Sequence, residues 1–207
     1  MVLDPTDFLD DENWRGGYYE LAIDLGERTD SESDARIVAA LKSMWSDPTL
    51  EGCYLDRWHS RSEQPRVPAV PIDVQEPVPL YGVATLPDGP RVVCVSHVIR
   101  EIGADVTPHD WLDLCLPTGA LGRVDDRIGG YPFGEDQSLE WRAPIDAWFF
   151  RIAANVFEAA GLRVALMGFE VSGNPAADDL KASSSGERRI AFALPTPEGL
   201  KFLPATE

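Results

Sequence analysis

Residues 80–99 read LYGVATLPDGPRVVCVSHVI, two apolar runs joined by a turn. Pro87 presets φ for such a turn, and Gly89 permits the positive φ that most side chains avoid. The two runs therefore predict a β-hairpin with strands over 80–86 and 91–99. Both alternating faces of the second strand are largely apolar, which is typical of a strand that has neighbours on both sides. We expect it near the centre of a sheet.

The segment before this hairpin predicts a strand, a helix and a second, short strand. Residues 18–25 alternate apolar positions with polar or small ones, the pattern of a half-buried strand. Thr29 and Glu32 have the spacing of a capping box, and apolar residues then recur at helical spacing over 31–46. A short strand at 52–55 would complete a β-α-β unit.

The segment after the hairpin predicts two helices and two strands. Thr107 is a good N-cap residue and Pro108 suits the first helical position, so we expect a short helix that ends at Leu116. Gly161 is a candidate for the position just past the end of a longer helix. The expected order is a short helix, a long helix and two strands, over 107–116, 144–160, 162–171 and 188–194. Together with the hairpin they predict an α+β fold, with a mixed, mainly antiparallel sheet, two main amphipathic helices and one short helix.

Composition and charge exclude several classes of protein. The chain has 207 residues, 44% of them hydrophobic, and a formal net charge of −17. Binding to nucleic-acid backbones or to anionic membranes requires clustered cations, so this charge argues against both. The sequence has neither a long apolar run nor a secretory signal pattern, and we expect a soluble cytoplasmic protein. The three cysteines form no C-x-x-C pair and are expected to be reduced.

We expect two parts in the chain. Residues 1–15 form a poorly ordered acidic N-terminal lead, which Phe8, Leu9 and Trp14 are able to hold against the rest. Residues 16–207 form a single α+β domain. Within that domain, residues 56–79 contain five prolines, so they are expected to run as an extended surface loop, either a lid or a passive connection.

The acidic residues are concentrated in two segments. Residues 1–34 contain 11 acids and 2 bases, and residues 101–140 contain 9 acids and 2 bases. Acidic runs often serve only to keep a protein soluble, but the second segment also holds aromatic residues that would act as anchors while carboxylates steer a basic partner. We therefore expect a non-enzymatic protein-interaction module, of which a bacterial immunity or inhibitor protein is one instance. The expected partner-binding residues are Asp125, Asp126, Arg127, Tyr131, Phe133, Glu135 and Asp136.

The alternative is a small enzyme or ligand-binding domain. Its site would lie under the Pro-rich loop 56–79, with His97 as a base projecting from a rigid strand and arginines holding an anionic substrate. A neutral core residue is the other interpretation of His97, because Val95 and Ile99 share its face. The expected ligand-binding residues are Arg57, His59, Arg61, Arg66 and His97.

The sequence carries no clear catalytic motif. The sequence contains no G-x-S-x-G, H-E-x-x-H, P-loop or EF-hand pattern. Cys94 and Ser96 lie on the opposite face of their strand from His97, so neither forms a nucleophile pair with it in a straight strand. His109 is expected on the surface, in the first turn of the short helix. No metal, cofactor or nucleic-acid partner is predicted, and the pattern leaves the oligomeric state open.

Overall fold

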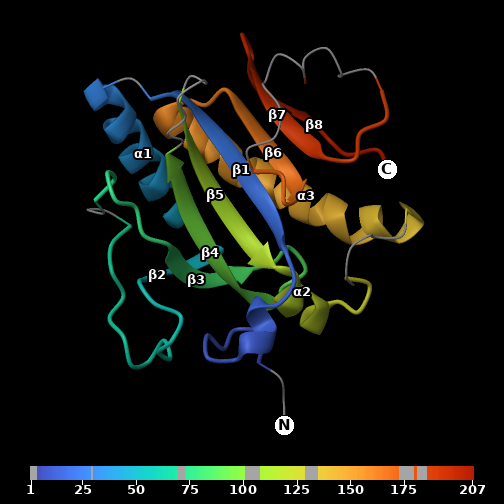
Figure 1. Ribbon diagram of the computed structural model, residues 1–207. Helices are drawn as coiled ribbons and strands as arrows, with labels where there is room; N and C mark the ends of the chain where they lie inside the picture. The colour runs from blue at the N-terminus through green and yellow to red at the C-terminus, as the bar shows by residue number, and fades with distance from the viewer. Residues whose placement is uncertain are drawn as a thin grey trace.

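The computed structural model has an α+β fold. It describes residues 4–28, 30–69, 73–100, 108–128, 135–172, 180 and 186–207. An eight-stranded sheet and three α-helices make up this described part (Figure 1). Neighbouring strands are all antiparallel, in the order β2-β3-β4-β5-β1-β6-β7-β8. The strands are β1 (Tyr18–Glu27), β2 (Leu50–Tyr54), β3 (Leu80–Thr85), β4 (Arg91–Arg100), β5 (His109–Pro117), β6 (Val164–Phe169), β7 (Ala191–Thr196) and β8 (Gly199–Leu203). The α-helices are α1 (Asp30–Trp45), α2 (Thr118–Val124) and α3 (Glu135–Ala160), and the 3-10 helix η1 (Asp11–Trp14) precedes β1.

The hairpin and its central second strand are confirmed. β3 and β4 pair in antiparallel register, and Gly89 in the turn between them has a φ of +95°. β4 lies between β3 and β5, as its two apolar faces indicate. β1 is central too, between β5 and β6, so its polar residues Glu20 and Asp24 are buried rather than half-exposed as the alternation predicted.

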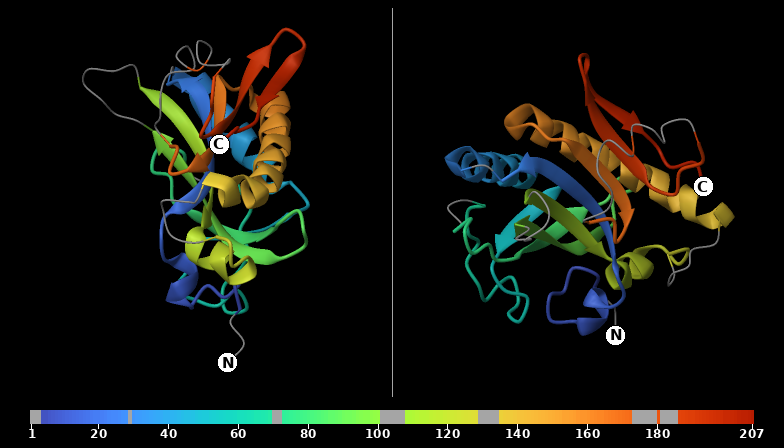
Figure 2. Two further views of the ribbon diagram at one scale, coloured as in Figure 1. Left: turned by 90° about the vertical axis from the view of Figure 1, so that its right-hand side faces the viewer. Right: turned by 45° about the horizontal axis from the view of Figure 1, so that its top comes forward.

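Helices α1 and α3 pack against each other on one face of the sheet (Figures 1 and 2). Their apolar stripes and every second residue of β1 and β5 form the main core. Burying a large apolar side chain of this kind contributes about 1.5–3 kcal/mol relative to leaving it exposed. Fully buried members are Tyr19, Leu21, Ile23, Ile37, Leu41, Met44, Leu112, Leu114 and Phe149. No helix in the described part of the chain is both long and apolar enough to cross a membrane.

The opposite face of the sheet has a smaller apolar cluster around β6 and β7. Leu166 and Phe192 belong to it, together with Leu180 from the segment after β6. Towards β4 the same face becomes polar, with Asp113 and His97 directly across from each other on β5 and β4. This polar part of the face positions the candidate site.

The short helix expected over 107–116 is wrong, because His109–Pro117 forms strand β5 between β4 and β1. Leu112 and Leu114 face the helices while the residues between them face the other side, the alternation of a strand buried on both faces. Burial on both faces outweighs the local capping signal. Pro117, which directly follows the expected helix, is instead the N-cap of α2, which begins at Thr118.

The expected β-α-β unit is also wrong. β1 and β2 are separated by β5, β4 and β3, so α1 connects the centre of the sheet to its edge. The strand expected over 188–194 is β7, Ala191–Thr196, and it is not the last, because β8 pairs with it.

The main helices are present with one changed boundary. α1 is confirmed at Asp30–Trp45, whereas Thr29 of the expected capping box lies outside the described residues. α3 begins at Glu135 rather than at 144, with Pro144 inside the helix. Gly161 follows α3 with a φ of +71°, as its expected position past the helix end requires.

The N-terminal lead packs against the sheet and against α2. Asn13 is fully buried, and its amide nitrogen donates to the backbone carbonyls of Asp4 and Asp7, both at 2.8 Å. Arg123 of α2 donates to the Asn13 side-chain oxygen and to the Asp10 carboxylate, both at 2.6 Å. The lead and α2, which belong to the two acidic segments of the sequence, therefore lie side by side (Figure 1).

The first part of the Pro-rich loop is closed at its base by contacts between residues 52–53 and 66–67. Val67 and Cys53 exchange backbone hydrogen bonds of 2.8 and 3.4 Å, and Arg66 donates to the backbone carbonyl of Gly52. Residues 54–66 therefore project from the edge of the sheet with both ends fixed.

Candidate functional site

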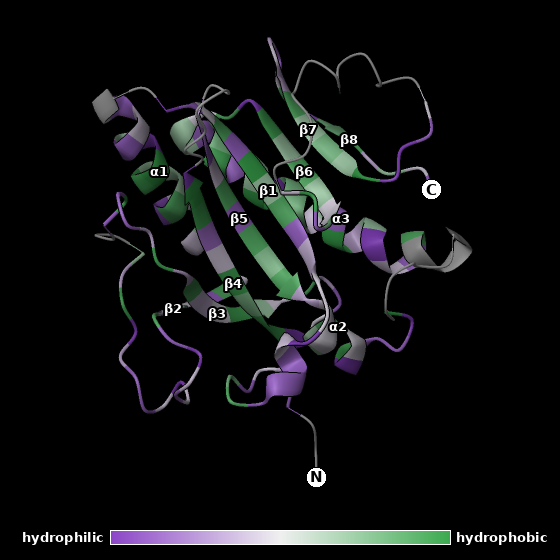
Figure 3. Ribbon diagram, viewed as in Figure 1, coloured by the Kyte–Doolittle hydropathy of each residue, from purple (hydrophilic) through white to green (hydrophobic). Residues whose placement is uncertain are grey.

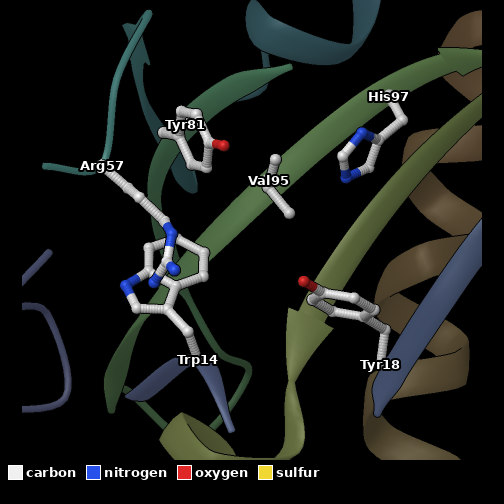
Figure 4. A pocket seen from close by; sticks show the side chains of 6 residues that line it. All are labelled: Trp14, Tyr18, Arg57, Tyr81, Val95 and His97. Atoms are coloured by element: carbon white, nitrogen blue, oxygen red, sulfur yellow. The ribbon is translucent and has the colours of Figure 1, made fainter. Parts of the chain in front are cut away.

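A pocket opens on the sheet face opposite α1 and α3, next to the lead (Figure 4). Its cavity volume is about 120 Å³. Three strands, η1 and the Pro-rich loop each contribute to it, so it is assembled from five separate segments. The lining residues are Trp14, Tyr18, Arg57, Tyr81, Val95 and His97.

The strand register explains why these side chains meet. Val95 of β4 lies across from Tyr81 of β3 on one side and Cys115 of β5 on the other. His97, two residues further along, lies across from Asp113. Because residues two apart in a strand share a face, Val95 and His97 point into the same space.

His97 is half-buried at this pocket. Burial lowers the pKa of His97, so the ring is neutral at pH 7 and has one N–H donor and one acceptor nitrogen. Within the described residues the ring has no hydrogen-bond partner. Cys94 and Ser96 face the other side as predicted, and Ser96 accepts a hydrogen bond there from the indole N–H of Trp45 at 3.0 Å.

Tyr18 and Tyr81 bring two phenol hydroxyls to the pocket. Burial raises the pKa of both phenols, so both keep their protons at neutral pH. The charge of Arg57, which lines the same pocket, acts on the pKa of both phenols in the opposite direction. Neither hydroxyl has a hydrogen-bond partner among the residues that the structure describes.

Arg57 lies at the mouth of the pocket. Its guanidinium stacks over the rings of Trp58, 4.1 Å from the centroid, and Trp14, 5.5 Å from the centroid. One nitrogen donates to a carboxylate oxygen of Asp11 at 3.4 Å, a long and weak contact. Its other N–H groups have no hydrogen-bond partner in the described ranges.

Two buried carboxyl groups lie beside the pocket on the same face. Glu20 accepts a hydrogen bond from the backbone N–H of Ser172, and Asp113 accepts one from the Ser172 hydroxyl, both at 2.7 Å. The Cys115 thiol donates to Glu20 at 3.5 Å. Burial raises the pKa of both carboxyl groups, that of Asp113 to about 7. The second oxygen of Asp113 is buried and has no hydrogen-bond partner among the described residues.

The pocket brings together two of the five predicted ligand-binding residues, Arg57 and His97. The side chain of His59 is 63% exposed, and its Nδ1 lies 2.6 Å from a carboxylate of the same loop. Arg61 donates to a threonine hydroxyl of the lead at 3.0 Å, and Arg66 is bound to the backbone of β2. These last two side chains are engaged in attaching the loop.

The predicted partner-binding residues lie at and beyond the end of α2. Asp125 is bound by Arg127 through bonds of 2.6–3.1 Å, and Asp126 is exposed beside them. Arg127 also contacts a glutamate of α3 at 3.3 Å. The structure does not describe Tyr131 and Phe133. It also does not describe the side chains of Glu135 and Asp136.

His109 was expected on a helix surface, and the structure places it in β5 instead. Its Nδ1 lies 3.0 Å from a carboxylate oxygen of Asp24, and its Nε2 lies 2.9 Å from a nitrogen of Arg163. Asp24 lies near the other end of β1 from Tyr18, which lines the pocket, so His109 takes no part in the candidate site.

Sequence reasoning missed the aromatic lining and the buried carboxyl groups. A usable signal existed for Glu20 and Asp113, because each is a carboxylate inside an apolar strand sequence, where a charge is rare. Trp14 reaches the pocket only through the packing of the lead, whereas Tyr81 reaches it through the pairing of β3 with β4.

No group of three or more His, Cys, Asp or Glu side chains in the described ranges is placed to hold a metal ion. No protein-family model, curated protein or solved structure matches the chain.

Proposed function

We propose that the chain is a protein-interaction module that binds a basic protein. The proposal is carried by exposed apolar side chains on the surface formed by the lead (residues 4–15) and the loop (residues 54–66), two segments that contact each other and that we name the lead–loop surface. Leu9, Leu55 and Trp58 are 51%, 50% and 67% exposed there. They are three of the five large apolar side chains that are exposed in the described part of the chain. Apolar side chains that gather in one place mark interaction sites, whereas scattered ones do not.

Ring contacts hold the two halves of the lead–loop surface together. Phe8 packs edge-on against Tyr54 with ring centroids 5.5 Å apart, and Arg57 stacks over Trp14 at the same distance. Each exposed apolar residue directly follows one of these contact residues in the chain. The surface is therefore held in place before a partner arrives, which reduces the entropy lost on binding.

Carboxylates outnumber arginines on the lead–loop surface, by seven to four in residues 4–15 and 54–66. Asp7, Asp11 and Glu12 are exposed in the lead, and Asp56 lies in the loop. Figure 3 shows η1 and most of the loop as hydrophilic. The packing of α2 against the lead adds the exposed Asp126 to the same region. An apolar centre with an acidic rim favours a cationic partner, because the rim steers the encounter and the centre supplies the buried contact.

The class of partner follows from these features. Tryptophan and arginine dominate the binding energy of many interfaces, and Trp58 and Arg57 both belong to the lead–loop surface. We place the interaction in the cytoplasm, where the buried, unpaired cysteines of this chain would stay reduced. An inhibitor of a basic protein, such as an immunity protein that blocks a cationic toxin, is the function that fits a chain with a net charge of −17 best.

The test starts from the chain immobilised at low salt. The products of neighbouring genes and the proteins of its source cells are passed over it, and we expect a protein with a pI above about 9 to be retained and then released as salt rises. The purified partner is titrated by calorimetry into the unmodified chain, Trp58→Ser and Val78→Ser. Val78 is the matched control, because it is 47% exposed but lies outside the lead–loop surface.

Trp58→Ser is expected to weaken binding about 30-fold or more, the effect of losing a central tryptophan. Val78→Ser is expected to change the affinity by less than about threefold. Retention of no basic protein would contradict the proposal, as would a partner that binds both variants equally well.

A further inference from the structure

We propose that the pocket at the edge of the lead–loop surface binds a small aromatic carboxylate. This site does not depend on the proposed protein interaction, because its ligand would be a free small molecule. The inference rests on three observations: the size of the cavity, the hydrogen-bond donors that meet in it and the absence of any carboxylate among its lining residues.

The size of the cavity limits the ligand to one ring. Its volume is about 120 Å³. A dry cavity of about 150 Å³ is large enough for benzene, whereas drug-sized ligands fill pockets of about 300 Å³ or more. The walls of the pocket therefore enclose about one ring at most, and a nucleotide or a peptide segment would extend beyond them. The side chains of Trp14, Tyr18, Tyr81 and Val95 supply apolar surface to the lining (Figure 4).

Hydrogen-bond donors without a protein partner meet in this space. The hydroxyls of Tyr18 and Tyr81 and the ring N–H of His97 have no hydrogen-bond partner in the described residues. Arg57 adds the N–H groups that its contact with Asp11 leaves free. These residues are partly buried, and a ligand that accepts several hydrogen bonds at once would engage the donors together.

The charge of the lining selects an anion. Arg57 is its one charged residue, and a guanidinium matches the two oxygens of a carboxylate with two parallel N–H donors. Asp11 competes weakly, because it makes a single 3.4 Å contact and its side chain is 75% exposed. A ligand amine would meet the like charge of Arg57, so cations are disfavoured.

The test uses the full chain and benzoate as the probe. Spectra of ¹H–¹⁵N correlations, which include the indole N–H of Trp14, are recorded during the titration. We expect saturable shifts of that indole and of backbone amides near Val95 and His97. Inorganic phosphate, benzamide and benzylamine are titrated in parallel, and each is expected to bind at least about tenfold more weakly, because each lacks the ring or the negative charge.

Three variants assign the contacts. Arg57→Gln removes the charge and is expected to weaken benzoate binding about tenfold or more, and Tyr81→Phe removes one hydroxyl and is expected to weaken it about three- to tenfold. Arg15→Gln is the matched control, because Arg15 is 71% exposed in the lead and does not line the pocket, and it is expected to bind benzoate unchanged.

The proposal is overturned if benzoate gives no saturable shift at tens of millimolar, or if Arg57→Gln binds it as well as the unmodified chain does. Phosphate binding equal to that of benzoate would also overturn it, because the ring would then contribute nothing. Each of these outcomes leaves the proposed protein interaction standing, since that interaction is measured with a protein partner and with Trp58→Ser.

Discussion

Asp113 shows at the scale of one residue how burial changes the chemistry of a side chain. It is 2% exposed, and burial raises its pKa from 3.8 to about 7, helped by the nearby Glu20 and opposed by the hydrogen bond from Ser172. Between about pH 4 and 7 the folded protein therefore holds a proton that the unfolded chain has released. The free energy of unfolding must fall as pH rises through this window, and the loss is complete above pH 7.

Asp113→Asn is expected to remove this loss of stability. Asparagine cannot ionise, and its amide oxygen can still accept the hydrogen bond from Ser172. The variant should match the unmodified chain near pH 4 and exceed its free energy of unfolding near pH 8 by an amount on the order of 2–4 kcal/mol. Urea unfolding at the two pH values measures the difference.

The control for this prediction is Asp126→Asn, which changes an exposed carboxylate and is expected to have little effect at either pH. A lower stability of Asp113→Asn at both pH values would show that the carboxyl group is needed in its ionised form, contrary to the direction of its pKa shift.

The candidate site could be predicted from the sequence only in part, and the reason lies in individual residues. His97 was singled out because a histidine stood in an apolar strand, and Arg57 because it stood near the Pro-rich loop. Trp14 was expected to help hold the acidic lead in place, but nothing in the sequence placed it near His97. Its place at the pocket depends on Phe8 and Asn13, whose burial is a tertiary effect.

At the scale of elements, β5 shows why local signals fail. A Thr-Pro pair is a typical helix start, but the residues after it alternate between two buried faces. Strand β5 joins β1 and β4, which are far apart in sequence, so its pairing energy comes from contacts that a local pattern cannot reveal. The β3–β4 hairpin was predictable for the opposite reason, because its partner strands and its turn are adjacent in the chain.

The contact between η1 and α2 is a second element-scale feature, and it depends on Gly119. A Cβ added at this position would lie 2.2 Å from the backbone oxygen of Glu12 and 2.9 Å from that of Arg15. Alanine would favour the helix by about 1 kcal/mol, but a clash with rigid backbone costs more, about 1–3 kcal/mol. Gly119→Ala is therefore expected to lower the free energy of unfolding by up to about 2 kcal/mol in urea unfolding.

The same substitution at Gly186 is the control, because a Cβ there meets nothing within 4 Å. Gly186→Ala should stay within about 0.5 kcal/mol of the unmodified chain. If Gly119→Ala were more stable than the unmodified chain, the lead would not be packed against α2 in solution.

At the scale of the whole molecule, the fold brings together acidic segments that are far apart in the sequence. The sequence has two acidic segments, and the fold joins parts of both where the lead meets α2. Several of these carboxylates are bound by arginines, such as Asp10 by Arg123 and Asp125 by Arg127. The α+β class was predictable from the pattern, whereas the strand order and this joining were not, because both depend on long-range packing.

The acidic rim predicts how binding depends on salt. The association rate with the basic partner is expected to fall about tenfold or more between about 50 and 300 mM salt, because screening weakens electrostatic steering. The dissociation rate should change far less, since it reflects the desolvated apolar centre. Stopped-flow mixing at several salt concentrations measures both rates, and a salt effect confined to dissociation would contradict the role given to the rim.

The place of the interaction is measured by hydrogen–deuterium exchange of the chain alone and in its complex with the purified basic partner. We predict that the partner slows exchange at backbone amides of the lead–loop surface, within residues 8–14 and 54–58, while the edge strand β8 is unaffected. Protection confined to other parts of the chain, with these two segments exchanging as in the free protein, would contradict the proposal that the lead–loop surface binds the partner.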